Sequence, residues 1–92
     1  MGVPNKTKVL RVSGSSPTKE TAGSIVKTYE AGYTDIELRA IGASSVNQMF
    51  KAMATASSIF AQKGKVLSFR PGYDVADIDG DKTVLIARLI VE

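Results

Sequence analysis

Small and hydrogen-bonding residues gather in the stretch RAIGASSVNQMFK, which runs from Arg39 to Lys51. Gly42 and Ser44 would let a ligand approach the backbone closely. Arg39 and Lys51 would add positive charge, and Asn47 would add an amide. The first N–H groups of a helix have no intrahelical partner and attract anions, so a helix beginning here would form a phosphate site. The alternative is that the glycine permits a turn and the serines cap the helix.

The loop SGSSP, residues 13–17, is a second place where backbone N–H groups precede an expected helix. It lacks the G-x-x-x-x-G-K-[ST] order of nucleotide-binding loops, so nucleotide hydrolysis is not predicted. The hydroxyls of Ser15 and Ser16 and the charge of Lys19 could still contact phosphates.

The chemistry of most enzymes and metal sites is not supported by the residues present. The chain has no cysteine and no histidine, so Ser-His and Cys-His relays cannot be built. The stretch DVADIDGD holds four aspartates but departs from the calcium-loop order, because the glycine comes too early and no closing glutamate follows. We therefore expect no enzyme, no cofactor, no small-molecule substrate and no metal, and we interpret residues 79–81 as a hairpin turn.

The composition is that of one small globular domain spanning residues 1–92, with 43% hydrophobic and 23% charged residues. No run is long and apolar enough for a membrane span, and the polar residues 1–8 do not resemble a signal peptide, so a cytoplasmic location is expected. Up to Tyr73 there are ten Lys/Arg against four Asp/Glu, but from Asp74 onward there are two against five. This asymmetry suits a polyanion that contacts one surface. An excess of Lys and Arg over Asp and Glu can also serve solubility alone.

The elements that must position these residues are predicted from periodicity. Strands are expected at residues 8–14, 35–41, 65–69 and 82–91, the third interrupted by Pro71-Gly72 at a bulge or sheet edge and resuming near Tyr73. One helix should begin with Ser16 as N-cap and Pro17 at its first position, and end near Gly32. A second should begin at a Ser45–Gln48 capping box and end near Gln62.

This order predicts an α/β fold: a two-layer βαβαββ sandwich, with a four-stranded mixed sheet and two helices on one face. The apolar strand 82–91 should be central. The aromatic residues Tyr29, Phe50 and Phe60 are assigned to helix faces that meet the core, which leaves no stacking platform for bases.

Three blocks of the chain resemble the stage V sporulation protein S family: VSGSSPTKETAG (12–23), AIGASSVNQMFKA (40–52) and DIDGDKTVLIARLIVE (77–92). The resemblance implies a fold like that of Alba, the archaeal chromatin protein, a homodimer, nucleic-acid binding and a role in spore formation or a related developmental programme. The nucleic-acid-binding role that the resemblance implies falls on Gly42, Asn47 and Lys51. Unlike Alba, this chain has Ile41 rather than arginine before the glycine, and an acidic hairpin where Alba reaches along DNA with basic residues.

Two functions are therefore weighed. The first is a non-enzymatic regulator that binds nucleic acid, RNA or single strands rather than duplex DNA, through the two expected helix starts. Its site residues are predicted to be Ser15, Ser16, Lys19, Arg39, Gly42, Ser44, Asn47 and Lys51. The second is a protein–protein adaptor without nucleic-acid binding, which requires an exposed apolar patch.

Overall fold

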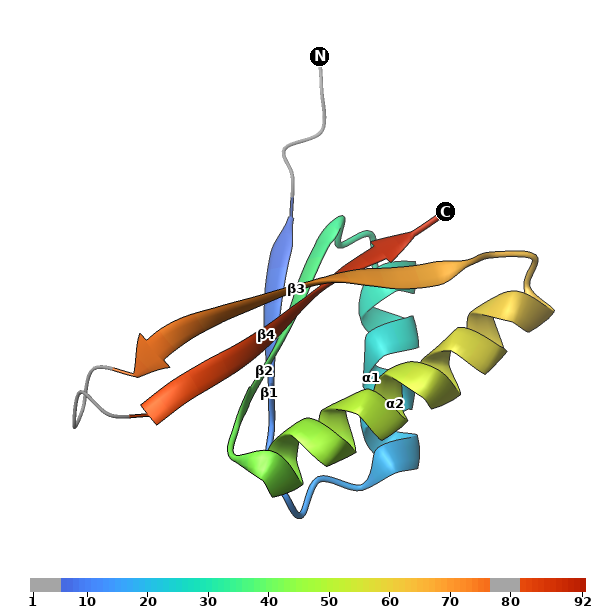
Figure 1. Ribbon diagram of the computed structural model, residues 1–92. Coiled ribbons are helices and arrows are strands. Elements are labelled where there is room, and N and C mark those ends of the chain that lie inside the picture. Colours follow the sequence, from blue (N-terminus) through green and yellow to red (C-terminus); the bar gives the residue numbers. More distant parts are fainter. Residues whose placement is uncertain (1–5, 77–81) are drawn as a thin grey trace.

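The computed structural model describes residues 6–76 and 82–92 and has the predicted βαβαββ order (Figure 1). The strands form one four-stranded sheet in the order β1-β2-β4-β3, in which β1 and β2 are parallel and the other pairs antiparallel. Both helices lie on one face of this sheet and pack together. The elements are β1 (Thr7–Val12), α1 (Thr18–Glu30), β2 (Asp35–Ile41), α2 (Ala43–Gln62), β3 (Leu67–Ala76) and β4 (Lys82–Val91).

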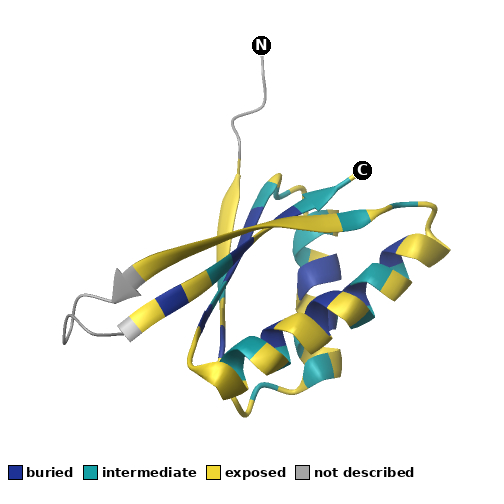
Figure 2. Ribbon diagram, viewed as in Figure 1, coloured by how far each residue is buried: buried dark blue, intermediate teal, exposed yellow. Residues whose placement is uncertain are grey.

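The core lies between the sheet and the helices because apolar residues repeat at the period of each element. In β2, Ile36, Leu38 and Ala40 alternate with polar residues and are buried against the helices. Each helix buries one stripe and exposes the opposite one (Figure 2). Tyr29 of α1 meets Phe60 of α2 edge to face, with ring centroids 5.3 Å apart.

The helix starts differ from the expected caps. Pro17 is the N-cap of α1 rather than its first residue, because its ψ of 130° is extended, and Ser16 does not cap the helix. Gly42 is the N-cap of α2, and neither helix has a side-chain cap hydrogen bond. The predicted capping box at Ser45 is therefore wrong. Both helix ends match the prediction, before Gly32 and Gly64.

Strand β3 is longer and more regular than expected. It runs through Pro71, which pairs with Ala87 of β4 without a break in register, so the predicted interruption is wrong. The predicted edge position is confirmed, and it explains why the missing N–H is tolerated: among the strands that the structure describes, β3 has a neighbour on one side only. Strand β4 is central, as predicted, while β1 ends at Val12 rather than residue 14. The expected turn at residues 79–81 lies outside the described residues.

Candidate functional site

The loop between β1 and α1 lies directly against the start of α2. A Cβ atom added to Gly14 would lie 2.4 Å from Oγ of Ser44, so only glycine allows this approach without movement. Gln48 Nε2 donates to the backbone carbonyl of Ser16 at 2.7 Å and lies 3.5 Å from Oγ1 of Thr18. These contacts bring the N-terminal ends of α1 and α2 to one end of the molecule, with the loop between them (Figure 1).

The serines of this loop hold its shape. The backbone N–H of Ser13 donates to Oγ of Ser16 at 2.8 Å, and the N–H of Ser16 donates to the carbonyl oxygen of Ser13 at 3.1 Å. The hydroxyl of Ser13 also lies 3.2 Å from that of Ser15 and 3.1 Å from that of Ser16. The predicted phosphate contacts Ser15 and Ser16 are thus part of a hydrogen-bonded turn, with Ser15 on the exposed side.

The start of α2 presents backbone donors at the surface. The first helical hydrogen bond runs from the N–H of Val46 to the carbonyl oxygen of Gly42 at 3.0 Å, so the N–H groups of residues 43–45 precede the ladder. Gly42 has φ of 88° and ψ of 157°, a conformation open essentially to glycine alone. Ser44 and Asn47 lie at the surface of this first turn and a half, and Lys51 is exposed one turn further on.

The predicted cations divide between two surfaces. Lys19 in the first turn of α1 and Lys51 in α2 are exposed and have no ion pair within residues 6–76 and 82–92. Arg39, in contrast, lies on the face of the sheet that the helices leave open. The physical reason is strand alternation: Ala40 points to the helices, and its neighbours point away.

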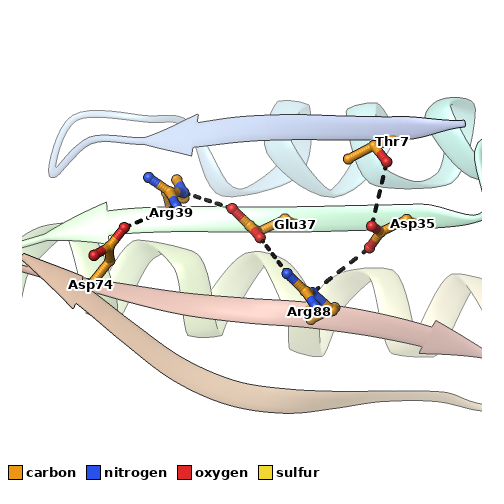
Figure 3. Close-up of polar contacts among 6 residues, drawn as sticks. All are labelled: Thr7, Asp35, Glu37, Arg39, Asp74 and Arg88. Carbon is orange, nitrogen blue, oxygen red and sulfur yellow. Dashed lines mark hydrogen bonds and ion pairs between the residues drawn. The ribbon is translucent and has the colours of Figure 1, made fainter.

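Arg39 is part of a row of ion pairs across β2, β4 and β3 (Figure 3). Its Nε lies 2.6 Å from Oε2 of Glu37, and its Nη2 lies 3.6 Å from Oδ2 of Asp74. Arg88 Nη2 reaches Oε1 of Glu37 at 3.0 Å, and its Nε lies 3.8 Å from Oδ1 of Asp35. Both oxygens of Glu37 are thereby occupied, which explains how the carboxylate of a residue that is only 8% exposed is stabilised there.

These contacts change the acidity of the groups involved. The hydrogen bond from Arg39, followed by that from Arg88, holds the pKa of Glu37 below its ordinary value, outweighing the opposite effect of burial. The same carboxylate raises the pKa of both arginines. Glu37 is therefore ionised at neutral pH, and much of the charge of Arg39 is neutralised within the protein.

Two hollows flank the start of α2. One, of about 280 Å³, lies beside the open face of the sheet and brings Arg39 together with Ser45 at the helix start. The other, of about 550 Å³, lies between α2 and β4, and Asn47 lines it. The predicted site is thus split, with Ser15, Ser16 and Ser44 at the loop, Arg39 at one hollow and Asn47 at the other. The smaller hollow is lined by Arg11, Val12, Ser13, Arg39, Ile41, Ser45 and Val84.

The larger hollow is lined by Phe50, an aromatic residue whose helical periodicity predicts a place in the core. Phe50 is 58% exposed, so that assignment is wrong, whereas Phe60 is buried and Tyr29 packs against it. Phe50 meets Phe69 of β3 edge to face, with ring centroids 6.0 Å apart. We call this surface the apolar groove. It is lined by Gly42, Ala43, Val46, Asn47, Phe50, Thr83 and Leu85, and continues past Phe50 along Met53, Ala54, Ser57, Leu67 and Phe69.

Sequence reasoning missed Arg11 as a site residue. Arg11 pairs in register with Arg39 on the neighbouring parallel strand, so both side chains share the open face. Arg11 is exposed, and only the pairing of β1 with β2 reveals its neighbour. Ser13 and Ser45, also missed, lie beside the same hollow.

Within residues 6–76 and 82–92, no three His, Cys, Asp or Glu side chains come together as a metal site. None of the described helices has the length and apolar character that crossing a membrane requires. The aspartates at positions 77, 79 and 81 lie outside the described residues.

Comparison with known families identifies a match that spans nearly the whole chain. The sequence model of the stage V sporulation protein S (SpoVS) family covers residues 8–92, including both helix starts and the sheet. The match indicates a role related to sporulation. The chain belongs to the stage V sporulation protein S family.

Proposed function

We propose that this protein binds nucleic acid non-enzymatically at the surface where α1 and α2 begin, as a regulator in a sporulation-related programme. We call this the helix-start surface; it comprises Ser15, Ser16, Lys19, Gly42, Ser44, Asn47 and Lys51. The observation that carries the proposal is the contact of Gln48 with Ser16 and Thr18, which places two helix N-termini side by side. Their backbone donors, together with the exposed ammonium groups of Lys19 and Lys51, suit phosphate oxygens.

The size of this surface favours RNA or single strands over a duplex. Two lysines and two helix starts can neutralise only a few phosphates, and the arginines of the row on the open face are largely compensated by Asp35, Glu37 and Asp74. Binding through about two phosphates gives a salt slope of roughly −1.4 for a single strand, far shallower than that of proteins that follow a duplex.

Fluorescence anisotropy with labelled RNA, single-stranded DNA and duplex DNA tests this function, at about 50 and 200 mM salt. Lys51→Ala should weaken binding to the single strands and reduce the salt slope by about 0.7. Lys27→Ala is the matched control, because Lys27 is exposed in the last turn of α1, at the opposite end of that helix. Absence of binding at low salt, or equal loss in both variants, would overturn the proposal.

We further propose that the protein is a homodimer and that a second copy covers the part of the apolar groove between Phe50 and Phe69, which leaves Gly42 and Asn47 of the helix-start surface open. The groove is lined by uncharged side chains, so an apolar surface is its natural complement. The chain itself presents one: in a two-fold arrangement, the exposed Phe50 of each protomer would enter the groove of the other.

The second candidate function is a protein–protein adaptor, and the same groove is what favours it. An exposed apolar surface beside Phe50 and Leu85 meets the requirement for a protein partner. The oligomeric state of the purified protein separates the homodimer from the adaptor. In a homodimer the second copy closes the groove, whereas an adaptor without its partner is a 9.8 kDa monomer with the groove open.

A further inference from the structure

The smaller hollow beside β1 and β2 is not used by the proposed nucleic-acid contact. It lies at the C-terminal ends of the parallel strands β1 and β2, the edge at which open α/β sheets commonly bind ligands. Ser13 follows β1 there, and Ser45 stands in the first turn of α2. Its volume of about 280 Å³ is suited to a small ligand or one residue of a polymer rather than a helix.

The two arginines of this hollow, Arg11 and Arg39, differ in how far nearby carboxylates neutralise their charge. Arg11 and Arg39 are register partners on strands that lie about 4.8 Å apart, so two positive charges face the same way from adjacent positions. Arg39 has Glu37 and Asp74 as counter-ions, but Arg11 is exposed and has no ion pair among residues 6–76 and 82–92. An anion bound between Arg11 and Arg39 would supply the negative charge that balances Arg11. Among the residues that the structure describes, the Nη1 group of Arg39 takes part in no ion pair, so it remains able to donate.

The other lining residues suggest what the anion is attached to. Ile41 is 46% exposed, and Val12 and Val84 are only 6% exposed, so apolar side chains meet the two arginines in one small space. Ser13 and Ser45 place hydroxyl-bearing side chains beside it. A ligand with a dianionic phosphate at one end and a flat, partly apolar body at the other would use both parts.

We propose that this hollow binds a phosphomonoester, either a free 5′-mononucleotide or the 5′-phosphate end of a nucleic-acid strand. A monoester carries nearly two negative charges at neutral pH, whereas a backbone diester carries one, so it gains more from a pair of guanidinium groups. The two sources share the phosphate chemistry and differ in whether a further nucleotide is attached to the sugar. This inference does not rest on nucleic-acid binding at the helix-start surface.

Isothermal titration with adenosine 5′-monophosphate and with adenosine provides the first test. The nucleotide should bind saturably and the nucleoside at least about tenfold more weakly, because charge-assisted hydrogen bonds to the phosphate are lost. Arg11→Gln should weaken nucleotide binding by about tenfold or more, and Arg11→Lys by less. Arg70→Gln is the matched control, since Arg70 is an exposed arginine of β3 that does not line this hollow.

The second arm compares short single strands that carry a 5′-phosphate or a 5′-hydroxyl. If the phosphorylated strand binds at least about tenfold more tightly than both its hydroxyl counterpart and the mononucleotide, and Arg11→Gln removes the difference, the ligand is a strand end. If the mononucleotide binds as tightly as the phosphorylated strand, the ligand is the free nucleotide. Each of these results supports the site.

The site is overturned if nucleotide and nucleoside bind alike, or if Arg11→Gln binds the nucleotide as the wild type does while remaining folded by circular dichroism. Lys51→Ala separates this inference from the proposed function. It should leave mononucleotide affinity unchanged within about twofold while weakening the 5′-hydroxyl strand, because Lys51 does not line this hollow.

Discussion

Gln48 and Ser16, which are 32 positions apart in the chain, are joined by a hydrogen bond of 2.7 Å from the amide Nε2 to the backbone carbonyl oxygen. The bond ties the loop before α1 to the first turns of α2. Because the first N–H groups of both helices precede the helical hydrogen bonds beside it, this contact sets the distance between two anion-attracting ends. The helix-start surface therefore depends on a side chain that would touch no ligand.

Replacement of Gln48 by alanine should lower the free energy of unfolding by about 1 kcal/mol, since a part-buried carbonyl loses its donor. Urea unfolding followed by circular dichroism measures the change. Asn47→Ala is the control: Asn47 is the neighbouring residue at the surface of α2 and should change stability by less than about 0.5 kcal/mol. Equal effects of the two substitutions would contradict a special role for the Gln48 contact.

Gly14→Ala should destabilise the protein by about 1 kcal/mol or more, because the new methyl group would lie 2.4 Å from Oγ and 3.0 Å from Cβ of Ser44. Ser44→Ala removes the nearer atom, so the double variant should recover part of the loss. Denaturant unfolding of the four proteins in a double-mutant cycle measures this coupling. Strict additivity would show that the loop moves away from α2 freely.

Gly23→Ala should have the opposite effect. Gly23 lies within α1, and a Cβ atom there would meet nothing within 4 Å. The substitution should raise the free energy of unfolding by about 0.5–1 kcal/mol, since alanine loses less conformational entropy than glycine on entering a helix. Thermal unfolding provides the measurement, and a loss of stability would indicate that α1 packs more closely at this position than the structure shows.

The depressed pKa of Glu37 makes its contribution to stability dependent on pH. Its stabilising effect is fully present above the ordinary value of 4.5 and is lost as the pH falls through the lower pKa of the folded state. Glu37→Gln should therefore cost about 1–3 kcal/mol at about pH 7 and progressively less below about pH 4.5. Unfolding measured across this range tests the trend. Glu30→Gln, which breaks the exposed pair with Lys63, should change little at either pH.

The fold was predictable because each element shows its own period in the sequence. In β2, the alternation of Ile36, Leu38 and Ala40 with charged residues gave both bounds of the strand, and glycines marked both helix ends. The starts of the helices were less predictable. Gln48 fits a capping pattern with Ser45, but a carbonyl from a distant loop is its partner, and local sequence contains no sign of that loop.

The site was predictable only in part, because it depends on which residues meet across elements. Arg39 and Lys51 are close in sequence, yet strand alternation places Arg39 on the open face of the sheet. Arg11 becomes a neighbour of Arg39 only through the parallel register of β1 with β2. Phe50 follows the helical stripe of the core, but it lies at the side of α2 beside the apolar groove, so its periodicity alone could not reveal its exposure.

The apolar groove makes the oligomeric state depend on Phe50. A second copy in the groove would bury this side chain, so Phe50→Glu should place a charge in an apolar interface and raise the dimer dissociation constant at least about a hundredfold. Sedimentation velocity at micromolar concentration should then show the 9.8 kDa monomer, against a dimer for the wild type. Val9→Glu is the control, because Val9 is an exposed apolar residue of β1, outside the groove. A monomeric wild type would contradict the homodimer and leave the groove to a different protein. A dimer that survives Phe50→Glu would show that the dimer interface lies on another surface.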